Sequence, residues 1–485
     1  MNMKQTLRRW LVIAHRWMAI ATCLLFVIWF ASGLVMMYVE YPRLTAAEKL
    51  ARLERIDWNR IAVTPEWALQ GLSLTAFPQT FRLVMINGEP VYLLDTGERV
   101  HAISAIDGRT KTNVGRLEAI DIVTRVEPHS AVASATTLER DQWSVAGTFD
   151  AHRPLHKVAL SDAEGTELYI SSATGEIVLD STRRERAWNW VGAVLHWIYF
   201  RDLRANGPLW SQVVMWTSGI GIFVAITGLW LGIDRLRLRR RNSQGSITPY
   251  RGWMAWHHLA GIIGGVFLLT WIFSGWLSMG PPVPWDKPFD MDRRAAAVDA
   301  YSGNSEARFP ASTSALQTLN PRSAREASFV WILGEPRVVL SDEHLHTTLI
   351  DPRSGAEPPI DESALIAAAP QLLPDARLTA TLRLEHEDAY WYSRRHERTL
   401  PVLRFIFDDA DRTWVHVDPQ TGKIVGWMRN SDRIHRWLFN ALHSFDFRWL
   451  LNARPVWDLL LWILSLAGLA ISASGVVIGW RHLRR

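Results

Sequence analysis

Four long stretches without Asp, Glu, Lys or Arg constrain this chain more than any other feature. They cover residues 17–39, 209–233, 252–280 and 459–480, which are 23, 25, 29 and 22 residues long. A helix needs about 20 apolar residues to cross the hydrocarbon core of a bilayer. The sequence therefore predicts an α-helical membrane bundle of four transmembrane helices and excludes a fully soluble protein.

Basic residues are concentrated in three short segments beside these stretches. Residues 1–10, 234–251 and 481–485 together carry +11, whereas the whole chain carries +5, so the remainder carries −6. Short loops rich in Lys and Arg stay on the cytoplasmic side of a membrane. We therefore expect both termini and the 234–251 loop in the cytoplasm, and the two long segments in the periplasm. The positive net charge then reflects orientation in a lipid bilayer, and we expect no nucleic-acid partner.

The chain repeats itself at a nearly constant offset. A shift of 247 residues aligns Leu195-His196 with Leu442-His443, and a shift of 242 residues aligns His15 with His257. Self-similarity at a fixed offset indicates repeated structural units. We therefore predict an internal duplication of one unit, which consists of a span, an outer domain, a short apolar helix and a second span.

The predicted units follow one another along the chain. They are a first transmembrane helix (1–39), a periplasmic domain (40–187), a periplasmic-face helix with the second transmembrane helix (188–233), a basic cytoplasmic loop (234–251), a third transmembrane helix (252–280), a second periplasmic domain (281–433), and a periplasmic-face helix with the fourth transmembrane helix and a basic tail (434–485). Strand-like runs with Gly-containing turns, such as 168–178 and 414–425, are accompanied by helical stretches. This pattern predicts two α+β periplasmic domains.

Four of the 16 histidines occupy repeat-equivalent positions in or beside the predicted spans. His15 and His257 lie near the cytoplasmic ends of the first and third spans, and His196 and His443 lie on the periplasmic-face helices. Ionisable side chains at this depth are costly, which favours a partner or a function. Paired imidazoles suit the two axial positions of haem iron, with the macrocycle between helices. The sequence thus predicts two bis-histidine haems near opposite faces of the bundle.

The composition restricts the type of cofactor and leaves alternatives open. Cys23 is the single cysteine, and the chain has no Cys-x-x-Cys-His motif, so any haem is non-covalent haem b. Second-tier ligand candidates are His435, His258 and His482, of which His435 could replace or assist His443. Two other interpretations are that the histidines only pack or form hydrogen bonds, or that they bind a bare metal ion. No cysteine or carboxylate cluster accompanies them to favour the bare ion.

Several short motifs resemble the PepSY-associated transmembrane family. They are Ala14-His15-Arg16-Trp17, Arg153-Pro154-Leu155-His156-Lys157-Val158, Leu168-Tyr169-Ile170 with Thr174-Gly175-Glu176, Trp188-Asn189-Trp190 and Leu195-His196-Trp197. The resemblance covers almost the whole chain. Within that family, the FoxB-like members are inner-membrane reductases of ferric siderophores, with four spans, PepSY-like periplasmic domains and membrane haems. The resemblance implies that His15, His196, His257 and His443 are the haem ligands.

These observations lead to one main functional hypothesis and two alternatives. In the main hypothesis, a membrane quinol or a cytoplasmic donor reduces the haem at His15 and His257, and the haem at His196 and His443 passes electrons to a ferric siderophore on the periplasmic side. The first alternative is a haem-free membrane-anchored PepSY regulator or sensor of a peptidase or peptide. The second is a transporter subunit, which is disfavoured because the spans contain no carboxylate and no interrupted helix.

Overall fold

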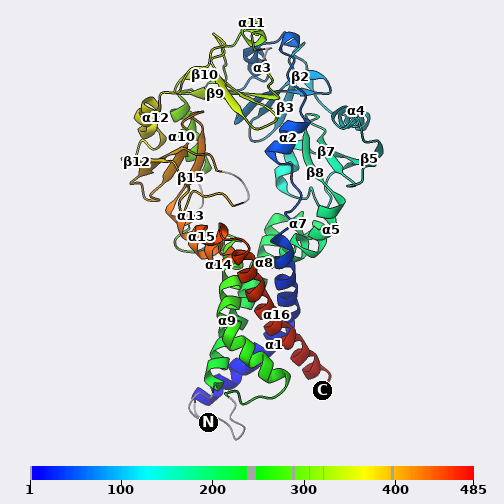
Figure 1. Cartoon of the computed structure of the whole chain (residues 1–485), viewed down its shortest axis with the longest axis vertical. Coiled ribbons are helices and arrows are strands. Elements are labelled where there is room, and N and C mark those ends of the chain that lie inside the picture. Colours follow the sequence, from blue (N-terminus) through cyan, green and yellow to red (C-terminus); the bar gives the residue numbers. More distant parts are fainter. Residues whose placement is uncertain (1–2, 237–246, 287–289, 305, 320–321, 395–397) are drawn as a thin grey trace.

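The computed structural model describes residues 3–236, 247–286, 290–304, 306–319, 322–394 and 398–485. A stem of long helices carries two lobes, and a sheet joins the lobes at the end farthest from the stem (Figure 1). Both termini lie at the free end of the stem (Figure 1). Most of the predicted 234–251 loop lies outside the described residues.

Four helices form the stem and confirm the four predicted spans. They are α1 (Met3–Met36), α8 (Gly207–Arg235), α9 (Trp253–Leu277) and α16 (Val456–Leu483), and each is long and apolar enough to cross a membrane. Contacts between α1 and α16, α16 and α9, α9 and α8, and α8 and α1 close the stem into a bundle. Large apolar side chains face outward from every helix, including Leu24, Trp216, Ile263 and Ile463, which are 60%, 70%, 76% and 64% exposed. An apolar exterior on all sides is the surface that lipid covers.

Seven antiparallel strands form the sheet that joins the lobes, which we call the shared sheet. Its strands are β1 (Thr80–Ile86), β2 (Glu89–Asp95), β3 (Val100–Ser104), β4 (Thr110–Lys111), β9 (Glu326–Ile332), β10 (Glu335–Ser341) and β11 (Thr347–Ile350). The order is β11-β10-β9-β1-β2-β3-β4, and Arg82 on β1 lies opposite Ser328 on β9. The sequence places β1 and β9 in two different outer domains. Their pairing removes one edge strand from each half and makes a single sheet.

Each lobe contains a second, four-stranded antiparallel sheet. The first sheet consists of β5 (Val132–Leu138), β6 (Leu155–Leu160), β7 (Glu167–Ser171) and β8 (Ile177–Ser181), and the second sheet of β12 (Leu378–Leu384), β13 (Val402–Phe407), β14 (Trp414–Val417) and β15 (Ile424–Met428). The predicted strand-turn-strand units are present, with Gly175 and Gly422 at φ +79° and +64° in the two turns. Glycine adopts this left-handed conformation without the steric cost that a Cβ would add.

Short helices complete the lobes and connect them to the stem. Those in the lobes are α2 (Ala46–Arg52), α3 (Pro65–Gly71), α4 (Arg116–Val126), α10 (Met291–Ser302), α11 (Thr313–Gln317) and α12 (Glu362–Ala368), with 3₁₀ turns at Trp58–Arg60, Gly147–His152 and Ala369–Leu372. Those between lobes and stem are α5 (Arg183–Val191), α6 (Ala193–His196), α7 (Arg201–Arg204), α13 (Asn430–His435), a π-helical turn (Arg436–Ala441), α14 (Leu442–Ser444) and α15 (Arg448–Leu451). Helices and antiparallel sheets together confirm the α+β class of the outer region.

The main core of the shared sheet is built from both halves of the chain. Phe81 and Tyr92 come from the first half, and Phe309 and Phe329 come from the second. The ring centres of Phe81 and Phe329 are 4.7 Å apart, and all four side chains are buried. Burial of large aromatic side chains across the β1–β9 seam therefore stabilises the junction of the lobes.

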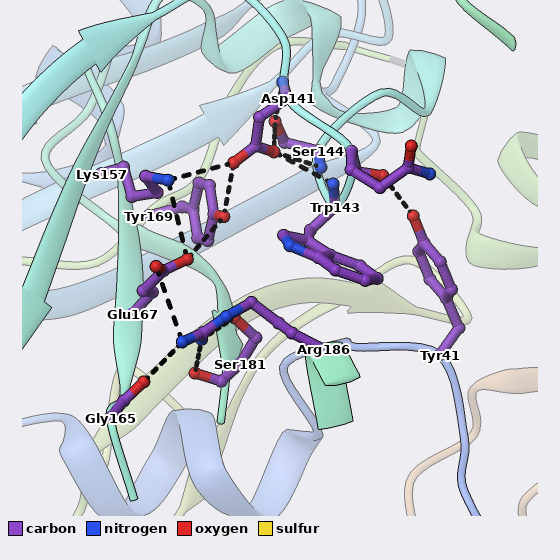
Figure 2. A network of polar contacts seen from close by, with 11 residues as sticks. Tyr41, Asp141, Trp143, Ser144, Lys157, Gly165, Glu167, Tyr169, Ser181 and Arg186 are labelled. Atoms are coloured by element: carbon purple, nitrogen blue, oxygen red, sulfur yellow. Dashed lines mark hydrogen bonds and ion pairs between the residues drawn. The ribbon is translucent and has the colours of Figure 1, made fainter. Parts of the chain in front are cut away.

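Repeat-equivalent arginines make the same pair of contacts in the two lobes. Arg186 donates to the carbonyl oxygens of Ser181 and Gly165, at 2.9 and 2.8 Å (Figure 2). Arg433 donates to the carbonyl oxygens of Met428 and Arg412, at 3.2 and 2.8 Å. Each guanidinium thus joins the helix that leads to the stem to two strand ends of its four-stranded sheet.

A buried cluster of charged residues holds the first sheet against the shared sheet. Arg82 on β1 lies 2.9 Å from both Glu176, in the β7–β8 turn, and Glu326 on β9. Lys49 on α2 lies 3.1 and 3.2 Å from the same two carboxylates. Burial opposes ionisation of Glu176, but the two cations outweigh it and hold the pKa of Glu176 well below its usual range. Four elements, namely α2, β1, β9 and the β7–β8 turn, are therefore joined through two cations and two carboxylates.

Replacing Arg82 should destabilise this junction strongly. In Arg82→Met, the buried Glu176 and the partly buried Glu326 share Lys49 alone, and breaking a buried ion pair costs about 3–5 kcal/mol. Arg109, whose side chain is 87% exposed, provides the control, because Arg109→Met should change stability by no more than about 0.5 kcal/mol. Thermal unfolding of the purified proteins in detergent compares them. Equal unfolding temperatures for Arg82→Met and Arg109→Met would contradict the conclusion that the cluster stabilises this junction.

The same cluster predicts a loss of stability in acid. The folded-state pKa values of Glu176 and Glu326 are lowered, so their contribution is present above the unfolded value of about 4.3 and is lost as the pH falls below it. The temperature at which half of the protein is unfolded should therefore decrease as the pH is lowered from about 5 to about 3. A Glu176→Gln/Glu326→Gln variant should have a lower unfolding temperature above this pH interval, and its unfolding temperature should decrease less across the interval. An equal decrease of the unfolding temperature in the wild-type protein and in the variant would show that these two carboxylates do not cause the loss of stability in acid.

Candidate functional site

The four repeat-equivalent histidines are held by the same kind of contact. Each Nδ1 lies within hydrogen-bond distance of a main-chain carbonyl oxygen and of a hydroxyl three residues later on a stem helix. The partners are Val224 and Thr227 for His15, Ile471 and Ser474 for His257, Trp29 and Ser32 for His196, and Trp271 and Ser274 for His443. The Nδ1 atoms of His15, His257 and His196 lie 3.1–3.2 Å from both of their partners, and that of His443 lies 3.0 Å from the Ser274 hydroxyl. One arrangement thus recurs four times in the bundle.

These contacts determine the tautomer of each imidazole. A carbonyl oxygen only accepts hydrogen bonds, so Nδ1 must carry the proton and donate it. The hydroxyls use their own protons within their helices, as Thr227 does toward the carbonyl oxygen of Phe223 at 2.8 Å. Their lone pairs are therefore free to accept from Nδ1. The lone pair of each ring then lies on Nε2, the nitrogen that a metal binds when Nδ1 is held in this way.

A glycine follows each hydroxyl and leaves room for the ring. The positions are Gly228, Gly475, Gly33 and Gly275, where a Cβ would lie 2.9, 3.6, 3.4 and 3.5 Å from Cε1 of the histidine concerned. We call the carbonyl, the hydroxyl three residues on and the glycine one residue further a histidine cradle. The sequence reveals these glycines, but not which histidine each one meets. A Ser/Thr-Gly pair in every span is the signal that could have pointed to the cradles.

The outer pair, His196 and His443, comes together above the stem. Their ring centres are 6.2 Å apart and their planes are inclined by 77°. A metal ion binds an imidazole nitrogen at about 2 Å, so the centres of two opposed imidazole ligands stand about 6 Å apart. Burial lowers the pKa of His196 to about 4, and burial together with the nearby His196 lowers that of His443 to about 3. Both rings are therefore neutral at pH 7, as metal ligation requires.

The first lobe positions His196 through Gln142. Tyr41, just after α1, donates to the carbonyl oxygen of Gln142 (Figure 2). The buried side-chain amide of Gln142 donates to the carbonyl oxygen of Tyr199 at 2.6 Å and accepts from the backbone N–H of Arg201 at 3.1 Å. The loop that carries Gln142 therefore clamps the chain directly after α6, so lobe and stem hold His196 together.

Phe439 separates His435 from the outer pair. The ring of Phe439 lies 5.1 Å from that of His443 on one side and 5.1 Å from that of His435 on the other. Phe439 belongs to the π-helical turn before α14, and such turns are frequent at functional sites. The structure therefore pairs His443 with His196 and leaves His435 outside the pair.

The inner histidines line one cavity within the stem. His15 and His257 face a space of about 380 Å³, which is walled mainly by apolar residues of the four stem helices. His258 and His482 reach the same wall. Both ring nitrogens of His258 are engaged, with Thr248 and the carbonyl oxygen of Gly232 at 2.8 Å. His482 is exposed and meets Trp17 edge-on at 5.7 Å. Of the four histidines that line this cavity, His15 and His257 are therefore the two that are held in cradles.

A pair of histidines held in cradles is the candidate ligand set at each site. Across the part of the chain that the structure describes, no three His, Cys, Asp or Glu side chains gather as a group that could hold a metal ion. Each site therefore offers two imidazoles. A metal held there needs its remaining ligands from another source, such as a macrocycle.

Comparison with known proteins places this architecture in a family. The family described as PepSY-associated TM region matches residues 10–350, a segment that contains His15, His196 and His257. The chain belongs to the PepSY-associated TM family. Together with the four apolar helices, membership of this family indicates a membrane protein. A search of curated proteins finds no match to the chain.

The cradle glycines can be tested within a single helix of this PepSY-associated TM protein. In Gly228→Ala, the new methyl group would press on the His15 ring, which should cost about 1–3 kcal/mol of stability. Gly219 on the same helix has none of the described atoms within 4 Å of an added Cβ, so Gly219→Ala should stabilise by up to about 1 kcal/mol. Thermal unfolding in detergent measures both. Shifts of the same sign would refute the close approach at Gly228.

Proposed function

We propose that this protein is a di-haem b electron-transfer protein of the bacterial inner membrane that reduces ferric siderophores on the periplasmic side. The observation that carries the proposal is the pair His196 and His443, with ring centres 6.2 Å apart and both Nδ1 atoms bound to stem helices. The PepSY-associated TM family is consistent with it.

The residues at both sites fit haem. At the outer site, the ring centres of two neutral imidazoles stand at the separation that bis-histidine ligation needs. At the inner site, His15 and His257 border an apolar cavity between helices, the environment that accepts a porphyrin. A haem iron bound by two imidazoles supplies one-electron redox chemistry. His196 and His443 would hold the outer haem, and His15 and His257 the inner one.

The protein's own groups orient the ligands and connect the two sites. Each cradle keeps the proton on Nδ1, which leaves on Nε2 the lone pair that would bind iron and makes the imidazole a stronger base. Phe26 borders the inner cavity, and its ring centre lies 5.8 Å from that of Trp29, whose carbonyl oxygen binds His196. Phe26 and Trp29 therefore connect the wall of the inner cavity to the cradle of His196.

Recurring contacts support the proposed internal duplication. The cradles of His15 and His257 lie on α8 and α16, and their positions differ by 247 residues, the larger of the two offsets found in the sequence. Those of His196 and His443 lie on α1 and α9, at positions related by the smaller offset. Two copies related in this way would place one haem near each face of the membrane.

Charge and the resemblance to FoxB-like proteins support the proposed orientation and substrate. The basic segments favour the cytoplasm for both termini, which lie at the free end of the stem, so we expect the lobes in the periplasm. A quinol or a cytoplasmic donor would then deliver electrons to the inner site. Fe(III) in the siderophore gains one electron at the outer site and becomes Fe(II), which hard oxygen ligands bind less tightly, and the siderophore is released intact.

An absorbance spectrum tests this proposal directly. Protein purified in detergent after haem-sufficient expression should show a Soret band, and dithionite should produce the α and β bands of reduced haem b. His196→Ala and His443→Ala should each remove one centre, and His15→Ala and His257→Ala the other. His258→Ala is the matched control, because both of its nitrogens bind protein groups, and it should retain both haems.

Two results would contradict the proposal. A wild-type protein without haem bands would favour the haem-free PepSY regulator or sensor of a peptidase or peptide. Haem that persists unchanged in all four ligand variants would exclude the two pairs named here. If the spectra agree, oxidation of the reduced protein by a ferric siderophore, followed in a stopped-flow instrument, tests the substrate.

A further inference from the structure

The wall of the inner cavity carries excess positive charge. Arg16 on α1 and Arg235 on α8 both line the cavity, whereas no Asp or Glu of the described residues does. Arg16 directly follows His15 along α1 and lines the cavity, although the residue as a whole is exposed. A guanidinium beside an apolar cavity favours an anionic partner.

The protein supplies little compensating negative charge at this place. Arg16 makes no hydrogen bond or ion pair with any residue that the structure describes. The nearest acidic group to Arg235 is Asp234, at 3.8 Å, and Asp234 also binds Arg8. One carboxylate thus stands near two guanidinium groups, and none stands at Arg16.

The charge comes from only one half of the chain. The positions that correspond to Arg16 and Arg235 in the second half are His258 and His482, which also line the cavity. His258 is fully engaged with protein groups, and His482 is exposed. The cavity therefore has two guanidinium groups on the helices of the first half and a mainly apolar remainder. It suits a ligand with an apolar body and anionic groups along one edge.

We propose that Arg16 and Arg235 bind the carboxylates of the porphyrin that His15 and His257 hold. This inference rests on the proposed haem function and adds the orientation of the inner haem, whose carboxylate edge would face these two arginines. Guanidinium binds carboxylate through two parallel N–H donors, and such charge-assisted bonds are strong in an apolar setting. A phosphate of a lipid headgroup offers the same anionic oxygen chemistry, so the experiment must separate the two sources.

The test compares iron protoporphyrin IX with its dimethyl ester, in which both carboxylates are neutral. The full-length protein carries His196→Ala and His443→Ala, so that only the inner site binds, and it is depleted of haem and titrated in detergent. This protein should bind the free acid at least about tenfold more tightly than the ester, because charged hydrogen bonds are lost with the ester. Adding Arg16→Gln and Arg235→Gln should abolish this preference by weakening the free acid alone.

Two variants control for charge and folding. Arg481→Gln removes a guanidinium that does not line the cavity, so the preference for the free acid should remain. Arg16→Gln/Arg235→Gln in a chain with intact outer histidines should keep the outer haem spectrum, which shows that the stem is folded. The midpoint potential of the inner haem should also fall in that variant, because loss of nearby positive charge favours ferric iron.

The outcomes separate this inference from the proposed function. If neither porphyrin binds to the inner site, the haem function itself fails there. If both porphyrins bind equally well before and after the arginine substitutions, the carboxylate contact is refuted while the haem site stands. A last comparison measures porphyrin binding in nanodiscs of anionic and of zwitterionic lipid. If the anionic lipid changes the affinity for the ester and for the free acid equally, the arginines bind lipid headgroups and the inference is overturned.

Discussion

The hydrogen bond from a histidine Nδ1 to a main-chain carbonyl oxygen of a neighbouring helix is the interaction on which the functional architecture depends. In an apolar bundle a polar ring needs a partner, and a helix offers few free acceptors. The cradle provides a carbonyl, a hydroxyl and a glycine that lets the ring approach. Each bond therefore joins two segments, sets the tautomer and leaves Nε2 available, as His196 on α6 does against Ser32 and Gly33 on α1.

The lobes stabilise the outer pair from the side opposite the stem. The shared sheet unites both halves of the chain through β1 and β9, and the cluster around Arg82 locks the first sheet to that seam. Gln142 then connects the first lobe to the segment after α6. His196 and His443 sit on short helices that could not hold a fixed distance alone. The lobes therefore help to set the separation of 6.2 Å between the two ring centres.

Much of the fold was predictable because its signals are local. Charge-free stretches marked the four helices, and glycine-containing turns marked β7–β8 and β14–β15. The pairing of β1 with β9 was not predictable, since the two edge strands lie in different halves of the chain and carry no signal of their partner. His258 and His435 illustrate the same limit at the site. Only packing assigns Thr248 and Gly232 to His258, or places Phe439 between His435 and His443.

The sequence by itself determined that four helices are apolar enough to span a membrane, and it singled out two repeat-equivalent histidine pairs, because hydropathy and repetition are read along the chain. Only the tertiary structure decided what each histidine touches. The carbonyl and hydroxyl partners of His15 belong to a different span, far away along the chain, and a carbonyl acceptor has no side-chain signature. Helix packing brings such groups together, and with them it determines the tautomer, the free nitrogen and the basic wall of the inner cavity.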